Sequence, residues 1–287
     1  MAEEWETIHS AEVAYKTWTT YQGHLNALIE EFEGKDIKDI THLDITLILQ
    51  RMAKQRYADK TVRSRFNVCN MIMQHAMYQR YITSNPCDIV KIPKGLVKTQ
   101  RELPDNSEIQ KVKDGLSCHF GLFAYFLLFT GLRRGEALAI EWKDIDFQRS
   151  TINVSKSIYF ENNRPKLKST KTVNGVRTIP LLAPLKKALS AFKFRNGYLF
   201  GGAEPMTEQA FRRAWERYKK DSGVTITPHQ LRHAYATILY DAEIDPKAAQ
   251  KLMGHSDYKT TVEIYTHISN SREQSAVEKL NSFVANF

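Results

Sequence analysis

Residues 229–236 read "HQLRHAYA" and combine the pattern of a buried helix with polar side chains that a core does not favour. The leucine, tyrosine and alanines of this stretch prefer an apolar environment, whereas Arg232 keeps its charge at any physiological pH. Pro228 favours the first position of a helix, which places His229, Arg232 and His233 on one face near the helix N-terminus. Backbone N–H groups at that end, together with an arginine fork, favour an anion such as phosphate. A buried arginine paired with a carboxylate, beside a core histidine, would explain the same pattern.

The composition is that of a globular protein, with 42% hydrophobic and 25% charged residues. Its net charge of +9 favours nucleic acid as a partner. Acidic and basic residues balance within residues 1–95, so the excess of positive charge lies in residues 96–287. Within the first of these segments, residues 1–44 are mainly acidic and residues 45–95 mainly basic. We interpret the basic part as a surface that faces phosphates.

Several classes of protein are disfavoured. No apolar run reaches the roughly 18–20 residues of a membrane span, and residues 121–132, "GLFAYFLLFTGL", are predicted to form a core helix. The N-terminus has no secretory apolar region. Cys69, Cys87 and Cys118 are scattered, which indicates a reducing compartment and neither a disulfide framework nor a CxxC metal site. We therefore expect a cytoplasmic protein.

Residues 1–92 are predicted to form a small, all-helical domain. Apolar residues at the helical period mark helices over residues 12–32, 44–58 and 59–78. Asp59 or Thr61 offers an N-cap for the third helix. Basic side chains gather on the second and third helices, and we expect them to bind DNA: Arg51, Lys54, Lys60, Arg63 and Arg65.

Residues 93–104 contain proline, glycine and charged residues without periodicity, which is typical of an interdomain linker. Residues 105–287 are predicted to form a second domain that combines helices with a small antiparallel sheet. Residues 151–160 alternate and are rich in β-branched and aromatic residues, and residues 176–182 are their expected hairpin partner across a basic turn. Further helices are expected over residues 184–194, 207–220, from Thr227 onward, and over 245–253. The predicted fold is thus mainly α.

Two further stretches carry polar residues at turns. "TGLRRGEAL" (130–138) places Arg133 just after the apolar helix, and "LMGHSDYKTTVEIYTH" (252–267) places His255 after a glycine and Tyr265 ten residues later. An arginine, a His-x-x-Arg, a Gly-His and a tyrosine, in this order, resemble the tyrosine recombinase (phage integrase) family. The resemblance covers nearly the whole chain and is strongest to integrases of phages and conjugative transposons. It implies a small helical core-binding (SAM-like) domain followed by a catalytic domain.

The resemblance also implies a pocket for a DNA phosphodiester. Arg133 and Arg232 would hold its non-bridging oxygens, on which negative charge gathers during attack, and His255 would donate a further hydrogen bond to them. Tyr265 would be the nucleophile, which forms a phosphotyrosine at the DNA 3′ end and frees a 5′ hydroxyl. Tyr258, nearer to the Gly-His turn, is the alternative nucleophile.

Two proton transfers and one supporting contact are implied as well. His229 would be the base for the phenol, whose ordinary pKa is about 10. In the family a lysine on the β-hairpin turn protonates the departing 5′ oxygen. Lys171, in "KTVNG", matches that lysine best, Lys168 is the second candidate, and Lys166 lies close by. Glu136 matches an acidic position of the family and would brace the active-site arginine or histidine side chains.

A metal site is the alternative explanation for the histidines. His229 and His233 are spaced as in zincins, but the residues between them lack the zincin glutamate, and Arg232 would repel a cation. We therefore expect no metal. In the family the covalent phosphotyrosine conserves the energy of the phosphodiester, so no ATP and no other cofactor is expected.

The resemblance predicts a site-specific recombinase that acts on double-stranded DNA, for integration or excision of a mobile element on the bacterial nucleoid. A chromosome-dimer-resolving Xer-like recombinase, a type IB topoisomerase-like enzyme and a catalytically silent DNA-binding relative are the alternatives. Two recombination sites of two strands each imply a homotetramer on synapsed DNA, formed from protomers that are monomeric or weakly associated when free.

The two ends of the chain carry expectations of their own. The apolar side chains of residues 271–287 would suit a helix that docks on a neighbouring protomer, although a self-packed end helix is equally open: Val277, Leu280, Phe283 and Val284. The sequence begins at the predicted core-binding domain, without the N-terminal arm-binding domain of many mobile-element integrases. The protein is either naturally short, as in dimer-resolving members, or trimmed, and we favour trimming.

Overall fold

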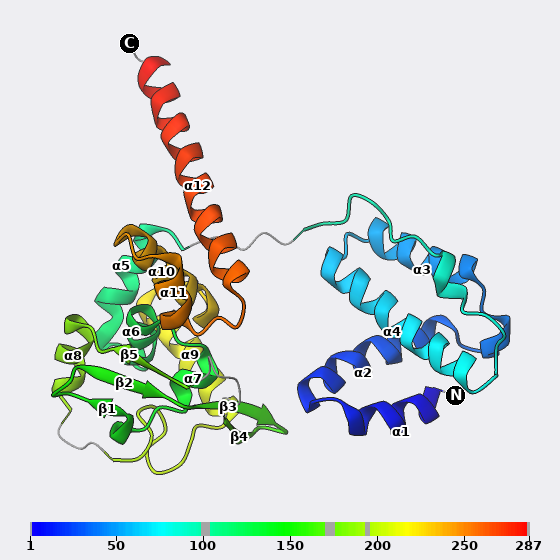
Figure 1. The fold of residues 1–287 in the computed structure, drawn as a ribbon, viewed down its shortest axis with the longest axis horizontal. Helices are drawn as coiled ribbons and strands as arrows, with labels where there is room; N and C mark the ends of the chain where they lie inside the picture. The colour runs from blue at the N-terminus through cyan, green and yellow to red at the C-terminus, as the bar shows by residue number, and fades with distance from the viewer. Residues whose placement is uncertain (1, 99–103, 170–175, 193–195, 286–287) are drawn as a thin grey trace. The chain divides into compact units, whose positions relative to one another are not determined.

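The computed structural model describes residues 2–98, 104–169, 176–192 and 196–285 and, within the last helix, part of the side chains. The chain divides into two compact units, Met1–Arg101 and Glu102–Phe287, which are described here one at a time (Figure 1). None of the helices in these ranges is long and apolar enough to cross a membrane.

The first unit is helical, as the sequence predicts. Its elements are α1 (Ala2–Glu12), α2 (Tyr15–Glu31), η1 (Ile37–Asp39), α3 (His42–Lys54), α4 (Asp59–Tyr78) and η2 (Pro86–Ile89). Apolar residues recur at the helical period in α2, α3 and α4 and bury Leu25, Ile45 and Val68 in one core. α3 begins with a capping box between Thr41 and Asp44.

Two details of this unit differ from the sequence-based expectations. α1 has no apolar stripe and is held mainly by Trp5, which is 1% exposed, so periodicity could not reveal it. α4 begins after Ala58, and neither Asp59 nor Thr61 is its N-cap. The carboxylate of Asp59 instead accepts hydrogen bonds from Arg63, one turn along the helix.

The segment that follows η2 also packs on the first unit. Leu96 contacts the cluster around Ile48 and Met52, and Val97 forms a parallel bridge with Ala58. The backbone N–H of Asp59 donates to the carbonyl of Val97 over 2.8 Å. The predicted linker, 93–104, therefore begins within the first unit, because Leu96 and the backbone of Val97 have partners there.

The second unit combines helices with short strands. Its helices are α5 (Asn106–Asp114), η3 (Gly115–Ser117), α6 (Gly121–Thr130), α7 (Arg134–Leu138), η4 (Trp142–Asp144), α8 (Ala183–Ser190), α9 (Glu208–Ser222), α10 (Pro228–Asp241), α11 (Pro246–Met253) and α12 (Tyr258–Ala285). Its strands are β1 (Ile145–Asp146), β2 (Thr151–Val154), β3 (Lys156–Glu161), β4 (Arg164–Ser169) and β5 (Arg177–Pro180). The predicted fold class, mainly α with a small antiparallel sheet, is confirmed.

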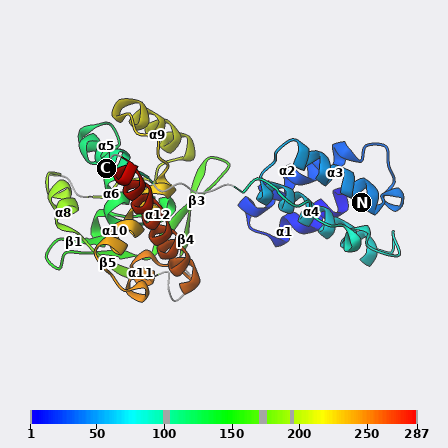
Figure 2. The same cartoon turned by 90° about the horizontal axis from the view of Figure 1, so that it is seen from above.

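Helix α6 forms the centre of this unit's core, as its wholly apolar sequence predicts. Phe123, Phe126 and Leu127 are fully buried, and α6 packs along α10. Figures 1 and 2 show both helices stacked over the sheet of β1, β2 and β5. α6 ends at Gly131, whose φ of +62° is a conformation that side chains disfavour.

The strands differ from the predicted single hairpin. β2 pairs antiparallel with β5, as expected, and β1 pairs with the other edge of β2. Between them, β3 and β4 form a separate two-stranded hairpin, so the expected long strand over 151–160 is interrupted at Ser155. The hairpin turns at Asn162 and Asn163, both with positive φ, which is the backbone that two-residue hairpin turns require and asparagine tolerates.

Candidate active site

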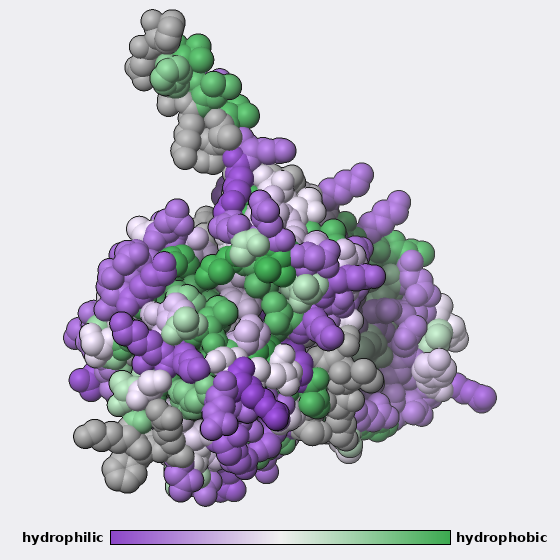
Figure 3. All heavy atoms as spheres, turned by 60° about the vertical axis from the view of Figure 1, so that its left-hand side comes forward, coloured by the Kyte–Doolittle hydropathy of each residue, from purple (hydrophilic) through white to green (hydrophobic). Residues whose placement is uncertain are grey.

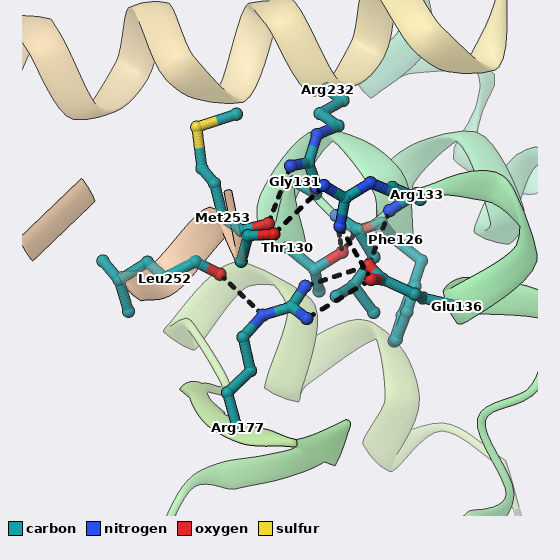
Figure 4. Close-up of polar contacts among 11 residues, drawn as sticks. Phe126, Thr130, Gly131, Arg133, Glu136, Arg177, Arg232, Leu252 and Met253 are labelled. Carbon is teal, nitrogen blue, oxygen red and sulfur yellow. Dashed lines mark hydrogen bonds and ion pairs between the residues drawn. The ribbon is translucent and has the colours of Figure 1, made fainter. Parts of the chain in front are cut away.

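Arg232 is buried at the point where two other helices end (Figure 4). Its Nη1 and Nη2 donate to the carbonyls of Gly131, after α6, and Met253, at the end of α11, each over 2.7 Å. Carbonyls at helix ends lack partners within the helix, so a guanidinium satisfies them. A Cβ at residue 131 would lie 2.1 Å from the Tyr235 ring, which explains the glycine. Burial, followed by the nearby Arg133, lowers the pKa of Arg232 to about 9, which leaves it cationic at neutral pH.

Arg133 lies beside Arg232 and is more accessible. Its Nη2 donates to the carbonyl of Gly254 over 3.0 Å, and Nη1 donates to Glu136 Oε1 over 3.0 Å. Because residue 254 directly follows Met253, the two guanidinium groups bind adjacent carbonyls. The Arg133 side chain is nevertheless 48% exposed, whereas Arg232 is buried.

A third arginine, Arg177 on β5, completes the cluster and was not predicted. Its Nη2 and Nη1 donate to Glu136 over 2.9 and 3.3 Å, and its Nε donates to the carbonyl of Leu252 over 3.1 Å. Burial raises the pKa of Glu136, but hydrogen bonds and charges from Arg177 and Arg133 outweigh it, so that the pKa is lowered overall. Glu136 thus braces two arginines at once. Alternation within β5 could have revealed Arg177, because it faces the same side as the buried Ile179.

His255 follows Gly254 and is 6% exposed. Its Nδ1 lies 2.8 Å from the hydroxyl of Thr261, which is on the first turn of α12. Burial lowers the pKa of His255 to about 3, with further lowering by Arg232 and Arg133, so the ring is neutral at physiological pH. It lines a hollow between β5 and α11.

Tyr265 is on α12, in the same unit, but its hydroxyl is not in the arginine cluster. The hydroxyl donates to the carbonyl of Ile244 over 3.3 Å, and the ring meets Tyr240 edge-on. Burial, then Asp245, raises the pKa of Tyr265 to about 12. Tyr258, the alternative nucleophile, is exposed at the start of α12.

The other predicted active-site residues are placed as follows. His229 is exposed on the first turn of α10, and its ring meets that of His233 edge-on at 4.6 Å between centroids. Lys168 and Lys166 are exposed on β4, opposite Ser157 and Tyr159 of β3. Lys171 lies outside the described residues.

Of the basic residues expected to bind DNA, three have side-chain partners within the first unit. Arg51 pairs with Glu31 over 2.7 Å, and Arg63 pairs with Asp59 over 2.9 Å. Arg65 donates to a ring nitrogen of His24 over 3.4 Å. Lys54 and Lys60 are exposed and make no ion pair with the described residues.

Comparison with known proteins decides the family. The model of the phage integrase family matches residues 101–272. The chain belongs to the phage integrase family. This recombinase is 30% identical to an XerC-like tyrosine recombinase of Caldanaerobacter subterraneus subsp. tengcongensis, over 92% of this chain and 77% of that protein. It is 28% identical to the ICEBs1 integrase of Bacillus subtilis, over 88% and 74% of the two chains.

A solved structure shows the same fold. The Tn1549 transposon integrase, in complex with transposon right end DNA, superposes on this recombinase with a TM-score of 0.73 at 23% identity, covering 98% and 99% of the two chains. Family membership makes the protein a tyrosine-type, site-specific DNA recombinase, an enzyme that cleaves and rejoins DNA.

Proposed function

We propose that this recombinase integrates and excises a mobile element, and that it cleaves DNA through a 3′-phosphotyrosine on Tyr265. The single observation that carries the proposal is the charge of the arginine cluster. Arg133, Arg177 and Arg232 come together around one carboxylate, Glu136, among the described residues. The cluster therefore keeps an excess of positive charge that an anion can neutralise.

A scissile phosphate supplies that anion. Arg133, whose side chain is half exposed, and Arg232 would donate to the non-bridging oxygens, and His255 would add a hydrogen bond. Negative charge grows on these oxygens as the phenol attacks, so donors that are already in place lower the barrier. Glu136 and Arg177 would keep the donors in position.

The chemical step forms a bond between the Tyr265 oxygen and phosphorus and breaks the bond from phosphorus to the DNA 5′ oxygen. The phenol proton passes to His229, and Lys171 gives a proton to the departing oxygen, with Lys168 as the second candidate. A pKa of about 12 makes proton removal from Tyr265 costly without a base. To reach the phosphate, the Tyr265 hydroxyl must also break its hydrogen bond to the carbonyl of Ile244. We therefore propose that α12, or the Tyr265 side chain alone, moves when DNA binds.

A suicide substrate tests this chemistry. In a DNA duplex nicked just beyond the cleavage position, cleavage frees a short fragment that carries the 5′ hydroxyl. This fragment diffuses away, so the covalent protein–DNA adduct accumulates. We expect an adduct with the wild type and none with Tyr265→Phe. Arg133→Ala should slow adduct formation by about 10²- to 10³-fold at saturating DNA, while Arg149→Ala, an exposed arginine at the turn before β2, should not. An adduct that persists in Tyr265→Phe would assign the nucleophile elsewhere, with Tyr258 next.

The proposed partners follow from the same scheme. Double-stranded DNA would be bound by the catalytic unit (102–287) and by the basic helices of the first unit, mostly through phosphates. Four protomers would act on two synapsed sites, and the apolar end of α12 would dock on a neighbour. The enzyme would work on nucleoid DNA in the cytoplasm.

Chromosome-dimer resolution is the second candidate, because the XerC-like relative is 30% identical over most of the chain. The DNA that remains covalently attached to Tyr265 separates the two functions. Fragments of a genomic library trapped on the enzyme would carry element ends if it is an integrase. They would carry a single chromosomal locus if it resolves dimers.

A further inference from the structure

We propose that Thr261 is a positioning residue, which fixes the neutral tautomer of His255 and ties that ring to the helix that carries Tyr265. The inference rests on the proposed function, in which His255 donates a hydrogen bond to the scissile phosphate. It adds a residue to the active site that the order of motifs does not include.

The contact is buried on both sides. Thr261 is 1% exposed and His255 is 6% exposed. The distance from Oγ1 to Nδ1 is 2.8 Å, which is a normal length for a strong hydrogen bond. Among the described residues, the Thr261 hydroxyl has no other partner. A threonine near the start of a helix commonly bonds to a backbone group, so its use here on a side chain is specific.

The geometry selects one tautomer. A buried hydroxyl must donate its proton, because an unsatisfied donor costs about 1–3 kcal/mol. The acceptor within reach of Thr261 is Nδ1, so Nδ1 must carry a lone pair and the ring proton must be on Nε2. Nε2 has no protein partner among the described residues, and it is therefore the nitrogen left to donate to a phosphate oxygen.

Positively charged neighbours keep the His255 ring neutral, so the position of its single proton matters. His255 faces Arg232, Arg133, Arg177 and His233, all of which oppose a positive charge on the ring. A neutral imidazole has only one N–H, whereas an imidazolium would have two. If the proton were on Nδ1, Nε2 would present a lone pair to the phosphate and repel it. The Thr261 hydroxyl thus decides whether His255 attracts the substrate.

Thr261 also links the ring to the nucleophile. It lies four residues before Tyr265, so both side chains are on one face of α12. The bond to His255 therefore anchors the first turn of this helix to the arginine cluster. When α12 moves to bring Tyr265 to the phosphate, we expect its first turn to stay in place.

Thr261→Val removes the hydroxyl and preserves the shape, while Thr261→Ser keeps the hydroxyl. Thr260→Val is the matched control, since Thr260 is the exposed neighbour on the same turn. Nitrogen NMR of histidine-labelled full-length protein reports which ring nitrogen carries the proton, and His255→Gln assigns the signal. We expect the Nε2–H form in the wild type, in Thr261→Ser and in Thr260→Val, and a mixture of tautomers in Thr261→Val. If Thr261→Val disturbs folding, Thr261→Ala is used instead to remove the hydroxyl.

Cleavage of the suicide substrate is the second measurement. Thr261→Val should slow it by about 10- to 100-fold at saturating DNA, and Thr261→Ser should restore it. An Nδ1–H ring in the wild type, or a ring unchanged in Thr261→Val and Thr261→Ala, overturns the positioning role whatever the cleavage rates are. A tautomer that responds to Thr261 in a protein that forms no adduct supports the positioning contact and rejects the proposed chemistry.

Discussion

Arg133 and Arg134 are neighbours in the chain, but their side chains lie in different surroundings. The Arg133 side chain is half exposed and lies beside Arg232. Arg134 turns the other way, where its guanidinium lies 5.6 Å from the Phe160 ring centroid and 5.1 Å from that of Phe211. Burial lowers the pKa of Arg134, although the nearby carboxylate of Glu208 acts in the opposite direction. The Arg134 guanidinium therefore packs on aromatic rings.

A pH dependence of stability is expected from His255. Its pKa is about 3 in the folded protein against 6.5 as an ordinary value, mainly because the ring is buried. Between these two pH values the unfolded chain binds a proton that the folded chain does not, so the free energy of unfolding falls as the pH is lowered through this window. In His255→Asn this contribution is absent, and the unfolding temperature of the second unit should depend less on pH between 6.5 and about 4.

Calorimetry at a series of pH values measures this effect. His119→Asn, which changes an exposed histidine of the second unit, is the matched control. If the unfolding temperature changed equally with pH in the wild type and in His255→Asn, the fold would not be keeping the His255 ring neutral.

At the scale of elements, short-range signals in the sequence define most boundaries correctly. α10 begins where Thr227 and Pro228 predict, with Thr227 and Gln230 forming a capping box. α5 begins after Asp105, whose side chain accepts a hydrogen bond from the N–H of Glu108. The hairpin of β3 and β4 was missed, although the adjacent asparagines at 162 and 163 are a two-residue turn signal. Its tip does more than reverse the chain, because it contacts the start of α9.

Asn163 joins these two elements. Its side-chain oxygen accepts from the N–H of Gln209 over 2.8 Å, and its carbonyl accepts from the N–H of Glu208 over 3.4 Å. Asn163 also has a φ of 66°. Asn163→Ala loses the side-chain acceptor and strains the turn, so we expect the second unit to lose about 1–3 kcal/mol of stability. Asn163→Gly relieves the strain and should lose less.

Chemical denaturation compares the three proteins, and hydrogen exchange at Gln209 locates the effect. Exchange should accelerate in both variants, because both lack the acceptor. If the alanine and glycine variants unfolded at equal denaturant concentration, the left-handed backbone would not contribute.

At the scale of the molecule, the C-terminal part of α12 exposes large apolar side chains. Ile268 on this helix is 1% exposed, whereas the four apolar side chains beyond it are 55–67% exposed: Val277, Leu280, Phe283 and Val284. Figure 3 shows these apolar groups on the projecting end of the helix. Large apolar side chains gathered in water mark a surface that another protein covers.

Leu280→Asp should therefore weaken the assembly of protomers on DNA. A carboxylate in an apolar contact must be desolvated without a partner, which costs several kcal/mol per interface. The thermal midpoint of the free protein should stay unchanged, because Leu280 is 61% exposed. Sedimentation of complexes on recombination-site DNA measures the assembly. Asn281→Asp adds the same charge at an exposed polar position and is the control; an equal loss of assembly in both would point to charge rather than to the apolar contact.

The local order of residues determined most of the helices of this protein and where they begin and end. Helical periods, a proline at a helix start and glycines at helix ends are short-range signals, and they predicted the helical first unit, α6 and α10. Other features depend on residues that are far apart in the chain. Alternation within β5 places Arg177 on the buried side, but only packing makes Glu136 its partner. Thr261 is an ordinary surface residue type in sequence, and only packing buries it against His255. The direction of the Tyr265 hydroxyl, toward Ile244, was likewise set by tertiary packing, because the partner of a buried polar atom is whichever distant group the fold brings within hydrogen-bond distance.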